Sequence, residues 1–279
     1  MVVGAAPEEE APAYARRPEE DAMLRGFTPP FTPKGTASLV PPPPWHYAGW
    51  FLSVAFECDS ARAAPFVPPA VGAATGLGAI HFADWQATTD GAELLDPIQA
   101  QYRETIVLLE VARPDGTAAN FCPLIYVDQD VSMLRGLLQG WPKKHGSTWL
   151  TRSLPLEHPA AAPLRAGARL GATLAVKDRR LAEARLTLTG RPGRALGFAA
   201  RPTWGTVGWA DLTAPERPPE LRFLRPLVTG RVEGGWHEAT AELAFLDAPR
   251  EELADLGLRR AVDANAGFLG ITVTGASAR

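Results

Sequence analysis

Cysteine, lysine and long apolar runs are scarce or absent in this chain of 279 residues. Its two cysteines, Cys58 and Cys122, are too few for a disulfide scaffold or a cysteine-rich zinc site. Because no run of about 18 apolar residues occurs, no membrane span is predicted. The N-terminus has no basic segment followed by a long apolar stretch, so we expect no secretory signal. These absences predict a cytoplasmic protein with reduced thiols.

Basic charge is not concentrated in any part of the chain. The formal net charge is −3 and the arginines are scattered, which predicts no nucleic-acid-binding surface. The five histidines have no metal-ligand spacing, and the sequence contains neither a phosphate-binding glycine loop nor a Gly-x-Ser-x-Gly elbow. We therefore expect no metal and no other cofactor, and a small molecule as the partner.

The scarcity of lysine makes its positions informative. Of 28 basic residues only four are lysine: Lys34, Lys143, Lys144 and Lys177. Arginine serves wherever a permanent cation is enough, whereas lysine can also lose its proton and attack a carbonyl as a free amine. The Lys143–Lys144 pair follows an apolar segment and is fixed by Trp141–Pro142. This pattern favours amine chemistry, and the alternative is a solvated basic turn.

An amine that forms an imine near neutral pH needs a lowered pKa, which desolvation or a neighbouring cation can provide. Lys144 is a neighbouring cation for Lys143 only if both side chains enter the same space. Adjacent residues of a strand point to opposite faces, so we expect desolvation to be the larger effect.

Glu104 is the candidate general acid and base. It begins a strand that becomes apolar two residues later, where a buried carboxylate is costly unless it is paired or functional. An ion pair with a neighbour or an exposed strand end is the alternative. Tyr102 shares a face with Glu104 at the period of two, so it either lines the same pocket or packs.

The apolar patterning predicts an α+β fold that is mainly antiparallel β. Residues 1–22 are predicted to be disordered, and the proline-rich arm extends to residue 44, followed by a single domain over 45–279. We expect strands at 50–57, 78–86, 101–111, 121–127, 147–151, 168–176, 181–190, 230–246 and 268–274. Helices are expected shortly after Asp59, over 131–139 and over 247–256, with Asp130 capping the second and Gly140 ending it.

Three motifs occur in order: Tyr102-x-Glu104, Pro123-x-x-Tyr126-Val127-Asp128 and Gly140-Trp141-Pro142-Lys143-Lys144. Together they resemble the acetoacetate decarboxylase-like superfamily, and the similarity covers roughly residues 45–275. The resemblance implies a β-barrel or cone with few flanking helices, a hydrophobic cavity and a homo-oligomer. It also implies that Lys143 forms a Schiff base, with Lys144 as its neighbour and Glu104 as the acid and base. Further candidates for substrate contact are Tyr102, Trp85, Gln86, Arg135 and Trp141.

Two positions depart from the pattern of true decarboxylases. The resemblance implies an arginine for the substrate carboxylate where this chain has Gly49, and a glutamate after the arginine where it has Arg135-Gly136. The predicted function is therefore a Schiff-base lyase of keto acids, of decarboxylase type. One alternative is an aldolase-dehydratase or cyclase that condenses a 2-keto acid such as pyruvate with an aldehyde. Another is a non-catalytic protein that binds a small molecule.

Overall fold

The structure, a computed structural model, describes residues 24–278. The predicted disordered segment 1–22 lies outside this range. The chain divides into two compact units between Pro41 and Pro42. No helix in the described part is long and apolar enough to cross a membrane.

The first unit is held by short-range hydrogen bonds. Arg25 and Thr32 form an isolated antiparallel bridge. The Thr28 hydroxyl donates to the carbonyl of Val40 at 3.2 Å and accepts from its amide at 2.9 Å, while the Ser38 hydroxyl accepts from the Thr28 amide at 2.8 Å. These bonds satisfy backbone groups in a segment whose prolines exclude regular ladders.

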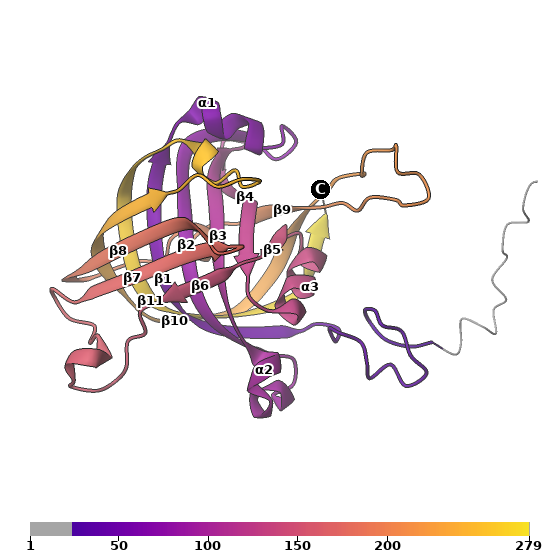
Figure 1. The fold of residues 1–279 in the computed structure, drawn as a ribbon, viewed down its shortest axis with the longest axis horizontal. Coiled ribbons are helices and arrows are strands. Elements are labelled where there is room, and N and C mark those ends of the chain that lie inside the picture. The colour runs from indigo at the N-terminus through magenta and orange to yellow at the C-terminus, as the bar shows by residue number, and fades with distance from the viewer. Residues whose placement is uncertain (1–23, 279) are drawn as a thin grey trace, which may run out of the picture. The chain divides into compact units, whose positions relative to one another are not determined.

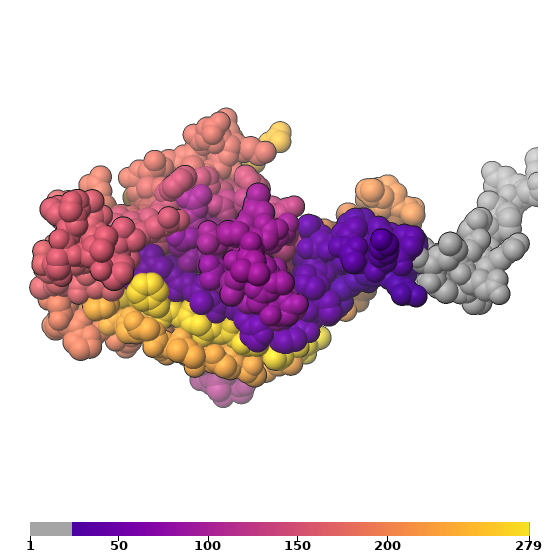
Figure 2. Space-filling model, turned by 90° about the horizontal axis from the view of Figure 1, so that it is seen from below, coloured from indigo at the N-terminus to yellow at the C-terminus, as the bar shows by residue number. Residues whose placement is uncertain are grey.

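The second unit is a mainly antiparallel β structure with few helices (Figure 1). Its strands are β1 (Trp45–Cys58), β2 (Ala73–Thr88), β3 (Gln101–Ala112), β4 (Ala118–Val127), β5 (Lys143–His145), β6 (Ser147–Leu150), β7 (Arg169–Val176), β8 (Arg179–Pro192), β9 (Thr203–Val207), β10 (Arg222–Phe245) and β11 (Leu258–Ala278). The α-helices are α1 (Ser60–Ala63), α2 (Pro97–Ala100) and α3 (Asp130–Gln139). The 3-10 turns are η2 (Ala64–Phe66), η3 (Ala92–Leu95), η4 (Pro159–Ala161), η5 (Gly197–Ala199) and η6 (Ala254–Leu256). Figure 2 views this unit from the side on which η3 and α2 project. The predicted fold class is confirmed.

The strand pairings close into a cone-like ring. The order is β11-β1-β2-β3-β4-β9-β10, and β10 pairs in turn with β11. The far half of the long strand β10 continues the sheet through β8, β7 and β6. All pairs are antiparallel except β4 with β5 and β4 with β9. The ring leaves β3 in a central position, where both of its faces are covered.

The apolar middle of β3 explains this position. Val107 and Leu109 pack in the large core cluster, whereas Ile106 and Leu108 pack on the opposite face with Cys122. All four of these β3 residues are buried. A strand that is apolar on both faces is most stable where both faces are covered. The prediction of a central β3 is confirmed.

Two local predictions are wrong. The helix expected over 247–256 is limited to the turn η6, because Pro249 cannot continue a helix and Arg250 has a φ of 65°. Its apolar residues Leu253 and Leu256 are nevertheless buried. Gln129, not Asp130, is the N-cap of α3, since its side chain accepts from the Ser132 amide at 2.9 Å.

Candidate active site

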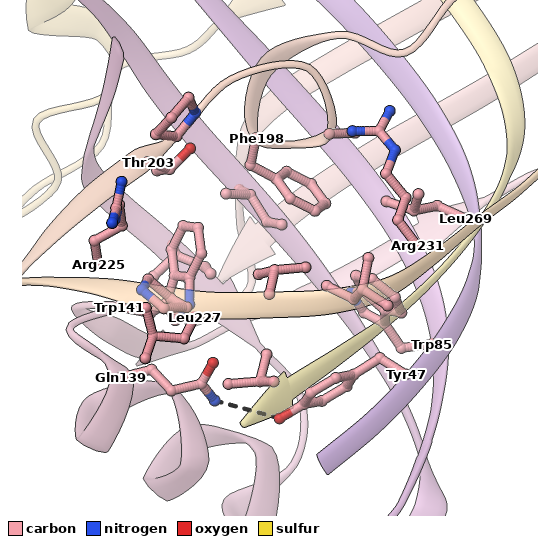
Figure 3. A pocket seen from close by; sticks show the side chains of 18 of the residues that line it. Tyr47, Trp85, Gln139, Trp141, Phe198, Thr203, Arg225, Leu227, Arg231 and Leu269 are labelled. Carbon is pink, nitrogen blue, oxygen red and sulfur yellow. Dashed lines mark hydrogen bonds between the residues drawn. The ribbon is translucent and has the colours of Figure 1, made fainter. Parts of the chain in front are cut away.

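The second unit contains a cavity of about 710 Å³ beside α3 (Figure 3). Its lining includes five aromatic side chains: Tyr47, Trp85, Tyr102, Trp141 and Phe198. Cavities of about 300–1,000 Å³ hold drug-sized ligands. The space is therefore larger than a three-carbon keto acid requires.

The end of α3 positions Lys143. Gly140 ends the helix in the left-handed conformation, with a φ of 93°, as the sequence predicted. The Trp141 amide then donates back to the Gly136 carbonyl at 2.9 Å. Strand β5 starts at Lys143 and pairs in parallel with β4. This bend directs the Lys143 side chain inward, where only 6% of it is exposed.

Lys143 lies against a carboxylate and a hydroxyl. Its Nζ is 2.7 Å from Glu104 Oε2 and donates to Ser132 Oγ at 2.9 Å. The Tyr102 ring centroid lies 5.3 Å from the same nitrogen, a distance at which the ring face attracts an ammonium group. The amine is thus held in one position beside a group that can take its proton.

Glu104 is held from both sides. Its Oε1 accepts from Trp85 Nε1 at 2.8 Å, while its Oε2 faces Lys143. Only 5% of the side chain is exposed. The hydrogen bond from Trp85 orients the carboxylate, and the 2.7 Å ion pair places its other oxygen where it can exchange a proton with the lysine nitrogen.

Lys144 points away from this site. Its Nζ pairs with Glu251 Oε1 at 2.6 Å, and 49% of its side chain is exposed. Glu251 also accepts from the Tyr126 hydroxyl at 3.0 Å. The side-chain alternation of β5 separates the two lysines as the period of two predicts. Lys144 anchors the segment after β10 and does not line the cavity.

The remaining predicted residues divide between the cavity and its surroundings. Tyr102, Trp85 and Trp141 line the cavity, but Gln86 and Arg135 do not. Gln86 is exposed and accepts from the Gln101 side chain at 3.3 Å. Trp85 and Gln86 are adjacent in β2 and point to opposite faces, so they could not both line one cavity.

Arg135 is buried on α3 behind the cavity wall. Only 3% of its side chain is exposed, and its Nη2 lies 3.4 Å from Glu93 Oε1. The residue after Arg135 is a glycine and has no carboxylate to offer. Glu93 supplies the carboxylate partner of Arg135 instead. Burial raises the pKa of Glu93, but hydrogen bonds from Thr88 and Thr89 outweigh it and lower the pKa to about 2. Glu93 is therefore an anion at neutral pH.

Two tyrosines of the cavity lining provide neutral hydroxyls. Burial raises the pKa of Tyr47 to about 12, although the Arg135 charge opposes the shift. Burial, reinforced by Glu104, raises the pKa of Tyr102 well above its usual range. The Tyr47 hydroxyl oxygen accepts from Gln139 Nε2 at 3.3 Å, as Figure 3 shows. Both phenols keep their protons and remain donors.

Sequence reasoning missed Ser132, Gln139 and Phe198. Ser132 and Gln139 are buried polar residues on α3, seven positions apart, and this is the spacing of one helix face. That regular polar face was the available signal. Phe198 lies in η5, and only the long-range return of the chain places it against Trp141, with ring centroids 6.3 Å apart. No local pattern indicates such a position.

Gly136 provides the space that Lys143 occupies. A Cβ at this position would lie 2.3 Å from both Cδ and Cε of Lys143. Non-bonded carbon atoms do not come this close. We expect Gly136→Ala to displace the amine from Glu104 and to reduce turnover at least tenfold, since misplacement by about 1 Å can cost about 10²-fold. Steady-state kinetics and the unfolding midpoint check this. Leu138→Ala, at an exposed position of the same helix, should leave turnover unchanged. Equal losses in both variants would show that the effect comes from α3 stability.

Comparison with known proteins adds family evidence to this geometry. A family model described as acetoacetate decarboxylase matches residues 27–277. No curated protein matches the chain significantly.

Several solved structures are similar to this chain. The enduracididine biosynthesis enzyme MppR, complexed with the condensation product of pyruvate and imidazole 4-carboxaldehyde, is 28% identical, with a TM-score of 0.84 over 91% of this chain and 96% of that one. MppR complexed with pyruvate is 27% identical, with a TM-score of 0.83 over 91% and 97%. An acetoacetate decarboxylase-like enzyme from Sphingomonas wittichii RW1 is 28% identical, with a TM-score of 0.82 over 91% and 98%.

Proposed function

Since the chain belongs to the acetoacetate decarboxylase family, we propose that it is a lyase that condenses a 2-keto acid, such as pyruvate, with an aldehyde through an imine on Lys143. The observation that carries this proposal is the buried Lys143 amine, 2.7 Å from Glu104 and 2.9 Å from Ser132, at one end of a large aromatic cavity. The proposal favours the aldolase-dehydratase alternative over the decarboxylase.

Imine formation begins with one proton transfer. The Lys143 ammonium gives a proton to Glu104, and the neutral amine attacks the C2 carbonyl of the keto acid. Glu104 returns the proton to the departing hydroxyl, so that water leaves and an iminium remains on Nζ. At 2.7 Å the carboxylate is within hydrogen-bond reach of the nitrogen throughout.

Carbon–carbon bond formation follows from the same pair of residues. The Glu104 carboxylate removes a proton from C3 of the iminium, which gives an enamine. The enamine carbon attacks the aldehyde carbon, and the new alkoxide takes a proton from Glu104. Glu104 then takes the second C3 proton and gives it to that hydroxyl, which leaves as water and gives the unsaturated imine. A further water hydrolyses this imine and releases the product and the Lys143 amine. One water is released overall.

The cavity lining supplies a hydrogen-bond donor for the keto-acid carboxylate. Tyr47 accepts from Gln139 and so keeps its own O–H free to donate. Arg135 is buried behind these residues, with an Nε that has no hydrogen-bond partner in the described part of the chain. A free hydroxyl donor in a low-dielectric site stabilises a bound carboxylate.

Gly49 argues against loss of that carboxylate. A Cβ at this position would lie 2.7 Å from Cε3 of Trp85, so the Trp85 indole takes the space that an arginine side chain here would need. The same indole holds Glu104. The arginine that the family resemblance associates with decarboxylation therefore has no room while Trp85 orients the acid.

Product analysis tests the proposed reaction. Incubation of the protein with pyruvate and imidazole 4-carboxaldehyde should yield, by mass spectrometry, a product equal to the two substrates less one water, with no carbon dioxide. Carbon dioxide release from 3-keto acids without condensation would establish the decarboxylase instead. Failure of both reactions, together with tight binding of an apolar ligand, would favour the binding-protein alternative.

A further inference from the structure

The cavity is lined by more positive than negative side chains. Its charged residues are Lys143, Arg201, Arg225, Arg231 and Glu104. Three of the four cations have a carboxylate partner. Lys143 pairs with Glu104 at 2.7 Å, Arg201 pairs with Glu110, and Arg231 pairs with Glu233 at 2.5 Å.

Arg225 differs from the other three cations. Within residues 24–278, no carboxylate oxygen lies within 4.0 Å of its guanidinium. Its Cζ lies 5.7 Å from the Trp204 ring centroid, and the residue is half-buried. A partly desolvated guanidinium without a carboxylate partner is costly, and a ligand anion would remove much of that cost. Arg225 is therefore the cavity cation that is available to bind an anionic group of a ligand.

Two of the arginines are much more exposed than Lys143. The side chains of Arg201 and Arg231 are 43% and 40% exposed, against 6% for Lys143. Figure 3 shows Arg225 on the side of Thr203 and Trp141, and Arg231 on the side of Leu269. Trp141 and Phe198 form part of the wall. The same cavity thus presents flat aromatic surface, a buried amine and a guanidinium without a carboxylate partner.

We infer that Arg225 binds a carboxylate of the aldehyde substrate, so that the second substrate is an aldehyde that carries both a flat unsaturated body and a carboxylate. A guanidinium binds a carboxylate through two parallel hydrogen bonds, and aromatic walls favour a flat body. The assignment of this ligand as an aldehyde rests on the proposed imine chemistry. The carboxylate subsite itself rests only on the charges and their pairing.

A matched pair of acceptors tests the inference by kinetics. We expect kcat/KM with pyruvate to be about 10- to 100-fold higher for para-carboxybenzaldehyde than for para-carbamoylbenzaldehyde, the range of a hydrogen bond to a charged group. Arg225→Gln should abolish this preference by lowering the rate with the carboxylate acceptor toward that with the neutral one. Arg222→Gln, an exposed arginine of the same strand that does not line the cavity, should retain the preference.

Binding of unreactive analogues separates this inference from the proposed function. para-(Hydroxymethyl)benzoate and its amide cannot form an imine or condense. Calorimetry should show the same carboxylate preference in the native protein and its loss in Arg225→Gln, even if pyruvate gives no product. Equal binding of both analogues by the native protein, or a preference that survives in Arg225→Gln, would overturn the inference. Unfolding midpoints of both variants show that they fold.

Discussion

Lys143→Arg is expected to reduce condensation below detection while the protein remains folded. Arginine keeps the positive charge opposite Glu104, so the ion pair persists, but a guanidinium does not act as a nucleophilic amine near neutral pH. Product formation by mass spectrometry and the unfolding midpoint measure the two parts of this expectation. We expect a large loss of activity because no other lysine of residues 24–278 lines the cavity.

Lys144→Arg is the matched control for this variant. Lys144 is the adjacent residue and also forms a 2.6 Å ion pair with a glutamate, but it lies outside the cavity. We expect turnover within about twofold of the native rate, since an arginine can preserve a half-exposed ion pair. Activity in Lys143→Arg together with its loss in Lys144→Arg would show that the roles within the pair are reversed.

Glu104→Gln is expected to slow turnover by about 10²–10⁴-fold, the usual contribution of a general acid and base. The amide oxygen can still accept from Trp85 Nε1, so the geometry of the site should survive. The amide cannot, however, exchange the protons that the imine and enamine steps require. Imine formation should remain possible but slow, which single-turnover kinetics with pyruvate alone can follow.

Glu251→Gln is the control for the Glu104 variant. Glu251 is likewise a glutamate paired with a lysine, and its side chain is only 8% exposed. We expect a small loss of stability, because Tyr126 and Lys144 lose a charged acceptor, and no loss of turnover per folded molecule. An unaltered rate in Glu104→Gln would reduce Glu104 to a structural residue.

Local periodicity predicted the backbone around Lys143. The helix end at Gly140 and the opposite directions of Lys143 and Lys144 both follow from patterns of a few residues, whereas the choice of Lys143 within the pair came from the family resemblance. The same alternation that separates Lys143 from Lys144 also separates Trp85 from Gln86. Applied to both pairs, it would have shown from the sequence alone that Trp85 and Gln86 cannot both line the cavity.

Long-range contacts account for most of what the sequence could not predict. The ring closes through the pairing of β10 with β11, and Phe198 reaches the cavity only because η5 returns across the sheet. Arg135 is paired with Glu93, which lies 42 residues earlier in the chain. The amphipathic pattern over 247–256 reflects real burial of Leu253 and Leu256, but Pro249 and the backbone of Arg250 exclude the regular helix.

Borohydride trapping with pyruvate tests the central claim most directly, because it requires only the imine and not the second substrate. After reduction and digestion, we expect a mass adduct that retains the pyruvate carboxylate on the peptide containing Lys143, and no adduct in Lys143→Arg. An adduct formed only from 3-keto acids, with the carboxylate lost, would support decarboxylation instead. If neither pyruvate nor any 3-keto acid labels this peptide, while a known Schiff-base enzyme is labelled under the same conditions, Lys143 does not form an imine and the account is contradicted.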